Sequence, residues 1–169
     1  RDDHVLISPA AATIPELPSW EPVATGAARN ASFQQAEDLE ASATGGSVVR
    51  RKADMFAGGK ALVWKDHGPD DSLEITVNVD TARQYRVGVT ALLSPESDHA
   101  KILMDGKPIY TDGRAIDLHT PHLDMLRNRR GNRRFALDKG THTLTVKACD
   151  ADGNPSDAPV GIDFIWLEK

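Results

Sequence analysis

Short stretches of alternating apolar and polar residues follow one another along the chain from Phe33 onward, separated by turn-forming residues. The clearest occupies residues 72–79, where every second residue from Leu73 is apolar, and residues 84–93 repeat the pattern. Because successive side chains of a β-strand point to opposite faces, each stretch predicts a strand with one buried face. Residues 80–83, between the two, predict a hairpin.

The rest of the chain carries shorter segments of the same kind and no helix-like period of ordinary length. The pair Asp105 and Gly106 is a strong turn signal between two of them. Residues 119–133 and 150–159 are expected to be irregular loops. Such short strands separated by turns are typical of an all-β antiparallel sandwich or barrel. Further strands are expected at residues 47–52, 60–65, 102–104, 108–110, 114–118, 135–137, 141–149 and 160–167.

The last apolar stretch, residues 160–167, carries a single acid, Asp163. Alternation places Asp163 on the same face as Ile165 and Leu167, opposite Ile162. A buried carboxylate is costly unless it is paired, hydrogen-bonded or bound to a metal. Asp163 therefore needs a partner.

The candidate partner lies near the other end of the sequence, in residues 33–39. The same alternation places Gln35 and Glu37 on one face of that segment, together with two apolar residues. Two strands from opposite ends of the chain, each with oxygen-bearing side chains among apolar ones, predict a site that joins the ends. Glu37 is expected to lie beside Asp163 in that site.

Length and proline content predict one domain preceded by a different kind of segment. The 169 residues suit a single domain, which we place at residues 31–169. Residues 1–30 contain four prolines and no sustained period, which indicates a linker or pre-domain segment. The chain begins at Arg1 rather than Met, which we interpret as a piece of a longer protein.

Composition and motifs argue against several classes of function. The net charge of -5 and the pI near 5.6 disfavour general nucleic-acid binding, and no apolar run is long enough to span a membrane. Cys149 is the only cysteine, so an internal disulfide and thiol-rich zinc sites are excluded. No hydrolase, metalloprotease, phosphate-loop or dinucleotide motif occurs. The chain therefore reads as a binding or accessory module and not as an enzyme.

Six short motifs occur in order at residues 35–38, 58–60, 71–79, 84–87, 139–144 and 161–165. Their order resembles the galactose-binding-like β-sandwiches, and the chain is most similar to carbohydrate-binding modules of families six and thirty-five. It also looks like accessory jelly-roll domains of bacterial polysaccharide-degrading enzymes. The resemblance implies a two-sheet antiparallel β-sandwich, a polysaccharide ligand and a covalently attached catalytic domain. It also implies a secreted, periplasmic or cell-surface location.

These modules usually carry a structural calcium between the first and last strands, held by an E-A-E type motif and the acid of the last strand. By resemblance the ligands here are Gln35, Glu37 and Asp163. Gln35 stands where the family has an acid, which lowers the ligand charge, although an amide oxygen remains a competent calcium ligand. The alternative is a hydrogen-bonded carboxylate near a Lys or Arg, with no metal.

The sugar site of these modules usually lies in the loops at one end of the sandwich, where an aromatic ring stacks on a pyranose. The matching aromatic is Trp64, followed by Asp66 and His67. Asp152 and Asn154 match a loop position that often supplies a polar contact to the sugar. Because the neighbours of Trp64 are apolar, the alternative is that it belongs to the core.

Five arginines lie within residues 127–134 of this acidic chain. Guanidinium groups pair bidentately with sulfate, carboxylate or phosphate, so we expect Arg127, Arg129 and Arg130 to help bind an acidic or sulfated polysaccharide. The alternative is a solvent-exposed loop whose arginines form ion pairs with nearby acids. The leading hypothesis is thus a non-catalytic carbohydrate-binding module. The alternative is an accessory domain that packs on a catalytic domain or on its own copies without binding sugar.

Overall fold

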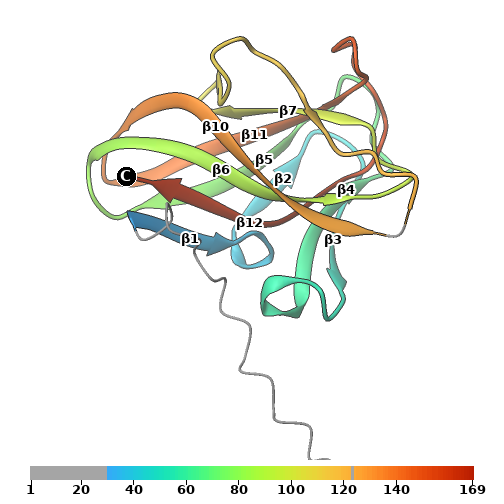
Figure 1. The fold of residues 1–169 in the computed structure, drawn as a ribbon, viewed down its shortest axis with the longest axis horizontal. Coiled ribbons are helices and arrows are strands. Elements are labelled where there is room, and N and C mark those ends of the chain that lie inside the picture. Colours follow the sequence, from blue (N-terminus) through green and yellow to red (C-terminus); the bar gives the residue numbers. More distant parts are fainter. Residues whose placement is uncertain (1–29, 123) are drawn as a thin grey trace, which may run out of the picture.

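The computed structural model describes residues 30–122 and 124–169, which form two antiparallel six-stranded sheets packed face to face (Figure 1). This architecture confirms the predicted all-β two-sheet sandwich. The segment expected to be a linker lies, except for Asn30, outside the described residues. Within the described part, no helix is long and apolar enough to cross a membrane.

The first sheet, which we call sheet A, contains the chain's last strand at its centre. Its strand order is β10-β6-β12-β4-β3, with β1 added against β12. Strand β12 therefore pairs with β6 on one side, and with both β1 and β4 on the other. The strands are β1 (Ala31–Gln35), β3 (Ser47–Lys52), β4 (Lys60–Lys65), β6 (Arg83–Leu93), β10 (Met125–Leu137) and β12 (Val160–Glu168).

The second sheet, sheet B, has the order β2-β5-β11-β7-β8, with β9 paired to β7. Between the two sheets lies one large apolar core, to which both contribute every second residue. Two short 3-10 turns, η2 (Ala36–Asp38) and η3 (Ala57–Gly59), follow β1 and precede β4. The strands are β2 (Ala41–Ala43), β5 (Leu73–Val79), β7 (His99–Met104), β8 (Lys107–Pro108), β9 (Ile116–Asp117) and β11 (Gly140–Cys149).

Two local predictions are wrong. Strands β5 and β6 do not form a hairpin, because residues 80–82 carry the chain from sheet B to sheet A and each strand finds distant partners. The expected loop at residues 119–133 contains most of β10, a strand of 13 residues at the edge of sheet A. The turn at Asp105 and Gly106 does join β7 to β8 as predicted.

Strand β12 also departs from simple alternation, because Asp163 is an extra residue in its pairing with β6. Ile162 faces Ala91 and Phe164 faces Thr90, which leaves Asp163 without a partner residue in a β-bulge. The bulge reverses the faces beyond it, so Ile162 and Ile165 both enter the core. Phe164 packs on the outer face of sheet A instead.

Candidate functional site

The polar residues predicted at the two ends of the chain do meet. Strand β1 runs antiparallel to the second half of β12, and the turn η2 that follows it carries Glu37 beside β12 and β4. Glu37 is 6% exposed and Asp163 is 1% exposed. Asp163 Oδ2 accepts a hydrogen bond of 3.2 Å from the Ala57 N–H of η3. The first strand, the last strand and the turn before β4 thus converge on one buried acid pair, here called the acid site.

The acid site lacks enough hydrogen-bond donors for its oxygens. Glu37 Oε2 and Asp163 Oδ1 are buried without a hydrogen-bond partner among the described residues. Burial raises the pKa of Asp163 to about 6, and the nearby Glu37 charge adds to this, while the Ala57 N–H lowers it. Burial likewise raises the pKa of Glu37. No Lys or Arg of the described residues forms an ion pair with either acid, but the Lys60 and Arg50 charges lower the pKa of Glu37 in part, and Arg50 Nε donates to the Glu37 carbonyl at 2.7 Å. The metal-free alternative, a hydrogen-bonded carboxylate near a Lys or Arg, therefore stays open.

The amide of Gln35 completes the acid site. One terminal atom of this amide lies 2.7 Å from the Ala57 carbonyl oxygen and 3.3 Å from Glu37 Oε1. With nitrogen in that position the amide donates to both oxygens. With oxygen in that position, the Gln35 amide oxygen, Glu37 Oε1 and the Ala57 carbonyl oxygen converge without a donor between them. Such a set of oxygens suits a calcium ion. The described residues hold no cluster of three or more His, Cys, Asp or Glu side chains that could bind a metal, and the acid site has only two of these side chains, beside the Gln35 amide.

A glycine closes the acid site. Gly58 has a φ of 69°, and a Cβ on it would lie 2.8 Å from Gln35 Oε1 and 2.9 Å from Glu37 Oε1. Both its backbone conformation and its closeness to the acid-site oxygens therefore require glycine. The three predicted ligands, with Gly58 over them, fit a calcium ion in their donor chemistry and in their unpaired oxygens.

Trp64, in contrast, cannot be the predicted sugar platform. Its exposed fraction is 0%, and its indole N–H donates to the Gly45 carbonyl at 2.9 Å. The ring stacks on His67 with centroids 3.6 Å apart. The expectation of a sugar-stacking face is therefore wrong, since β4 directs Trp64 into the core between the sheets, as the alternative held.

Asp66 and His67 line a groove at the end of the sandwich where the loops meet. The groove has a volume of about 660 Å³ and lies over the outer face of sheet A. Its walls come from the loop after β4, the loop after β6 and the loop before β12. The imidazole of His67 is almost fully buried, and its two nitrogens lie 3.1 Å from the Gly68 and Ala158 carbonyl oxygens. His67 therefore holds two of these loops together under the groove.

The floor of the groove is aliphatic and follows one row of cross-strand partners. Val49 of β3 pairs with Val63 of β4, Val63 with Gly161 of β12, and Gly161 with Leu92 of β6. A Cβ on Gly161 would lie 2.7 Å from the Leu92 Cβ, so glycine lets Leu92 fold over the strand. The floor is therefore an apolar surface built from four strands.

The rim of the groove is polar and carries charges of both signs. Lys65 and Asp66 form an exposed ion pair at 3.5 Å, and Asp66 has a φ of 57°. Carboxylates can accept hydrogen bonds from hydroxyl groups, while Arg and Lys donate them. The arrangement suits a ligand with an apolar side and many hydroxyls. The charged rim residues are Arg51, Lys65, Asp66, Glu96 and Asp157.

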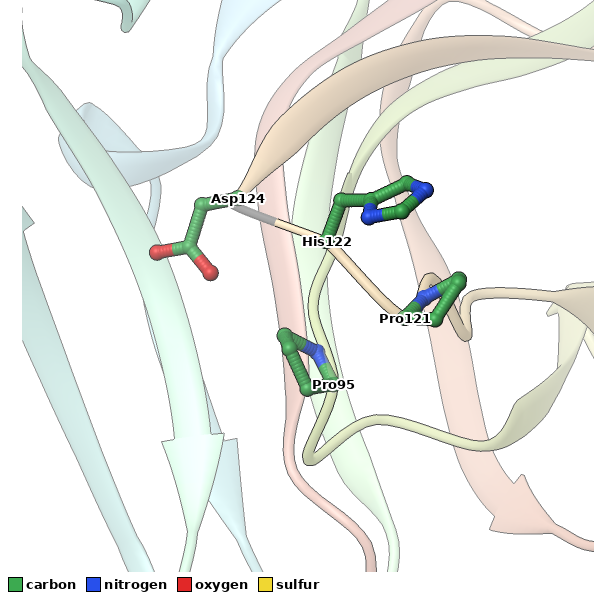
Figure 2. A pocket seen from close by; sticks show the side chains of 4 residues that line it. All are labelled: Pro95, Pro121, His122 and Asp124. Carbon is green, nitrogen blue, oxygen red and sulfur yellow. The ribbon is translucent and has the colours of Figure 1, made fainter.

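A second hollow of about 780 Å³ adjoins the groove, and Figure 2 shows the four side chains that line it. They are Pro95, Pro121, His122 and Asp124. Asp124 forms an ion pair with Arg51 of the groove rim, so this pair stands between the two hollows. With two prolines and two polar side chains, the second hollow offers few groups to orient a ligand.

Asp152 and Asn154 lie outside the lining of the groove. The Asp150 carboxylate accepts hydrogen bonds from the backbone N–H groups of both residues and from the Asn154 side chain. These contacts hold the pKa of Asp150 below its usual value. The loop is thus a self-contained turn, and the structure does not bring these two residues together with Asp66 and His67.

The arginines lie on an edge strand rather than in a loop, and most of them have partners. Arg130 forms a bidentate pair with Glu168, with distances of 2.6 and 2.9 Å. Arg129 donates to the Asp117 carbonyl, and Arg133 to the Pro108 carbonyl. Charged side chains along an edge strand also discourage pairing with another chain. Arg127 and Arg134 are exposed.

Solved structures with the same fold were found among carbohydrate-active proteins. A family 35 carbohydrate-binding module from Clostridium thermocellum has 21% identity and a TM-score of 0.56, over 82% of this chain and 98% of that chain. This chain has the fold of a family 35 carbohydrate-binding module. A Paenibacillus xanthan lyase shares that module fold with a TM-score of 0.69 and 18% identity, over 81% of this chain. A Podospora anserina β-(1,4)-mannanase described as GH26-CBM35 has 13% identity and a TM-score of 0.56, over 82% of this chain.

The module-like chain spans only 13% of the xanthan lyase and 27% of the mannanase. No protein-family model matches the sequence, and no curated protein has significant sequence similarity to it. The likeness is therefore one of fold.

Sequence reasoning missed the groove floor. Val49, Val63, Leu92 and Gly161 come from four strands, and only the pairing of those strands makes them a row. The one available signal was the alternation of β4, which places Val63 on the face opposite Leu62 and Trp64 but does not say which of the two faces is the core.

Proposed function

We propose that this chain is a non-catalytic carbohydrate-binding module that holds a glycan in the groove at the loop end of sheet A. The observation that carries the proposal is an aliphatic floor with a charged, hydrogen-bonding rim, in a fold shared with family 35 modules. Its volume of about 660 Å³ lies within the range of roughly 300–1,000 Å³ that is usual for small-molecule sites. The groove can take a short stretch of a polysaccharide.

The two parts of the groove have separate roles in this proposal. The aliphatic row under Gly161 covers the apolar face of a sugar ring, in place of the aromatic ring that Trp64 does not supply. Asp66, Glu96 and Asp157 accept hydrogen bonds from sugar hydroxyls, and Lys65 donates. Because such contacts replace hydrogen bonds to water, each one contributes little net affinity and the groove gains most from several at once.

Affinity gel electrophoresis over a panel of neutral, uronate-containing and sulfated polysaccharides tests the proposal. At least one polysaccharide should retard the wild-type chain, and Asp66→Asn should weaken that retardation while keeping the side-chain shape. Asp70→Asn is the matched control, because Asp70 is an exposed acid of the same loop that does not line the groove. Equal loss in both variants, or no retardation by any polysaccharide, would overturn the proposal.

The anionic glycan expected from the sequence remains part of the proposal. The groove rim has charges of both signs and does not by itself select an anion. Support comes from β10, where Arg127 and Arg134 are exposed on a strand that borders the same sheet. Uronate-containing and sulfated polysaccharides should therefore bind at least as well as neutral ones of similar linkage.

We also infer a structural calcium at the acid site. Gln35, Glu37 and Asp163 would hold the ion, and its charge would offset the cost of burying two carboxylates. The support is the pair of buried oxygens without donors, together with the converging Gln35 amide. The three ligands come from β1, η2 and β12, so the ion would tie the first strand to the last.

The module is further proposed to belong to a larger, secreted or cell-surface protein with a catalytic domain. The xanthan lyase and the mannanase support this, since the fold makes up 13% and 27% of those chains. The second candidate function is packing on such a domain without sugar binding. It is favoured by two exposed apolar side chains, Val49 in the groove floor and Met55 in the connection before β4, which are 37% and 39% exposed. Concentration-dependent association in sedimentation, without glycan retardation, would select it.

A further inference from the structure

Sheet A carries a second polar cluster on its outer face, at the opposite end from the groove. In the register of the sheet, Arg134 of β10 lies directly opposite Arg86 of β6, and Arg86 lies opposite Glu168 of β12. Arg130 is on the same face of β10 as Arg134. Three guanidinium groups therefore stand around one carboxylate. We call Arg86, Arg130, Arg134 and Glu168 the arginine cluster.

Only one of the three arginines has an acidic partner. Arg130 Nε and Nη2 occupy both oxygens of Glu168, at 2.6 and 2.9 Å. Within residues 30–122 and 124–169, no acceptor is found for the side chains of Arg86 or Arg134, and Arg86 Nε is buried without a hydrogen bond. The cluster thus holds two guanidinium charges beyond what Glu168 neutralises.

This arrangement is unfavourable without a further anion. Like charges directly opposite on neighbouring strands repel, and a buried donor without a partner is unfavourable. An oxyanion between Arg86 and Arg134 offsets the repulsion between them, because guanidinium forks match carboxylate, sulfate and phosphate groups.

A glycine gives the cluster its shape. Gly88 lies opposite Arg130 on β10 and opposite Trp166 on β12, and a Cβ on it would lie 2.1 Å from the indole ring. Without that Cβ, Trp166 rests on β6 and Arg130 reaches across the same strand to Glu168. Trp166 is only 8% exposed, so it borders the cluster and does not offer an open ring face on which a sugar could stack.

We propose that Arg86 and Arg134, with Arg130 held by Glu168, bind an oxyanion, and that its source is a carboxylate or sulfate group of a glycan. The source rests on the proposed carbohydrate-binding function, whereas oxyanion binding does not. Glu168 lies seven positions after Gly161 of the groove floor along β12, or roughly 20 Å of extended strand, so the two sites are distinct.

The first test uses inorganic sulfate as the probe, followed by thermal melting at constant ionic strength with chloride as the reference salt. Sulfate should raise the melting temperature of the wild type, and Arg134→Gln should lose most of that rise. Arg83→Gln is the matched control, because Arg83 is an exposed arginine of β6, the strand that carries Arg86, and lies outside the cluster. Equal rises in the wild type and both variants, or none in the wild type, would overturn the proposal.

The second test identifies the source of the anion by comparing dextran sulfate, polygalacturonate and uncharged dextran in isothermal titration. One anionic polymer should bind, and the double variant R86Q/R134Q should lose about tenfold or more in affinity, since it removes two charge-assisted contacts. A similar loss in R83Q would show general attraction to positive charge on sheet A and overturn the site. Binding of inorganic sulfate or phosphate without any polymer would overturn the glycan source alone.

The groove variant Asp66→Asn separates this inference from the proposed function. It should leave the sulfate response of the melting temperature unchanged. A chain that responds to sulfate but retains no polysaccharide would lose the proposed function and keep the oxyanion site. Should R86Q/R134Q fail to fold, R134Q alone carries the test, because Arg134 is exposed at the sheet edge.

Discussion

Two carboxylate oxygens, one from Glu37 and one from Asp163, are buried without a donor among the described residues. A protein can tolerate such a pair by keeping a proton on it or by holding a cation. The raised pKa values of both acids favour the first route, and with a pKa of about 6 Asp163 keeps a proton in mildly acidic solution. The Gln35 amide that converges on them is consistent with the second route.

Asp163→Asn distinguishes the two routes at this one residue. Without metal, at pH 7 and with EDTA, the variant should melt at or above the wild type, because an amide has no charge to bury. With millimolar calcium the wild type should gain several degrees and D163N little, since only a ligand bound by the folded state stabilises it. Scanning fluorimetry measures both. An equal calcium gain in D163N would remove Asp163 from the ligand set.

The meeting of Gln35, Glu37 and Asp163 was predictable because each residue stands out from its own segment by its chemistry. Asp163 is an acid in an apolar run, and Gln35 and Glu37 alternate near the other end of the sequence. The sugar-site residues were less predictable. Trp64 has the same signal in the sequence whether its strand turns it inward or outward, and only the packing of sheet A on sheet B decides this.

At the scale of secondary-structure elements, local sequence patterns predicted several strands but not which strands pair. Pairing depends on contacts between residues far apart in the sequence. Strands β3 and β4 were predicted with their observed bounds, because alternation and flanking glycines are local signals. The partners of β5 and β6 were not predicted, because two strands that are consecutive in the sequence can belong to different sheets. Strand β10 was missed because an edge strand is polar on both faces and its bulge between Arg130 and Arg134 breaks the period.

The close contact between Gly88 of β6 and Trp166 of β12 predicts that one added methyl group lowers the stability of the fold markedly. Gly88→Ala should destabilise the fold by about 1–3 kcal/mol, the usual cost of overpacking, because its Cβ would overlap the Trp166 indole. Urea unfolding measures this difference. In a W166A background the cost of G88A should shrink, as it does for residues in contact. If G88A destabilises the W166A variant as much as it destabilises the wild type, overlap with the Trp166 indole is not the cause.

The turns at the far end of sheet B predict a pH dependence. His142 Nδ1 lies 2.7 Å from Asp105 Oδ2, and Nε2 lies 2.9 Å from the Asp138 carbonyl. Burial of the ring lowers its pKa, but these hydrogen bonds and the Asp105 and Asp138 charges together raise it above the ordinary value. The stabilisation is therefore complete below the unfolded pKa near 6.5 and is lost as the pH rises through the folded value.

We expect the wild type to lose less than about 1 kcal/mol between pH 6 and pH 8 from this group, because Asp105 is partly exposed. Urea unfolding at several pH values measures the loss, and His142→Gln should not show it. A wild type whose stability rises over this interval by more than H142Q would contradict the assignment.

At the scale of the whole molecule, the bulge at Asp163 and the row through Gly161 place two features on one strand. The acid site ties β12 to β1, and the groove uses the first residues of β12 as its floor. Fixing the ends of the chain thus also fixes the strand on which a ligand would rest. Calcium removal should for this reason weaken glycan binding as well as stability, which titration in EDTA measures.

The measurement that tests the account most directly is amide chemical-shift mapping of the labelled chain. The titrant is an oligosaccharide from whichever polysaccharide retards the chain most in affinity gels. The account predicts shifts that concentrate at residues 63–67, 92–97 and 157–161, around the groove. Shifts confined to another part of the sandwich, or no polysaccharide that retards the chain, would contradict it.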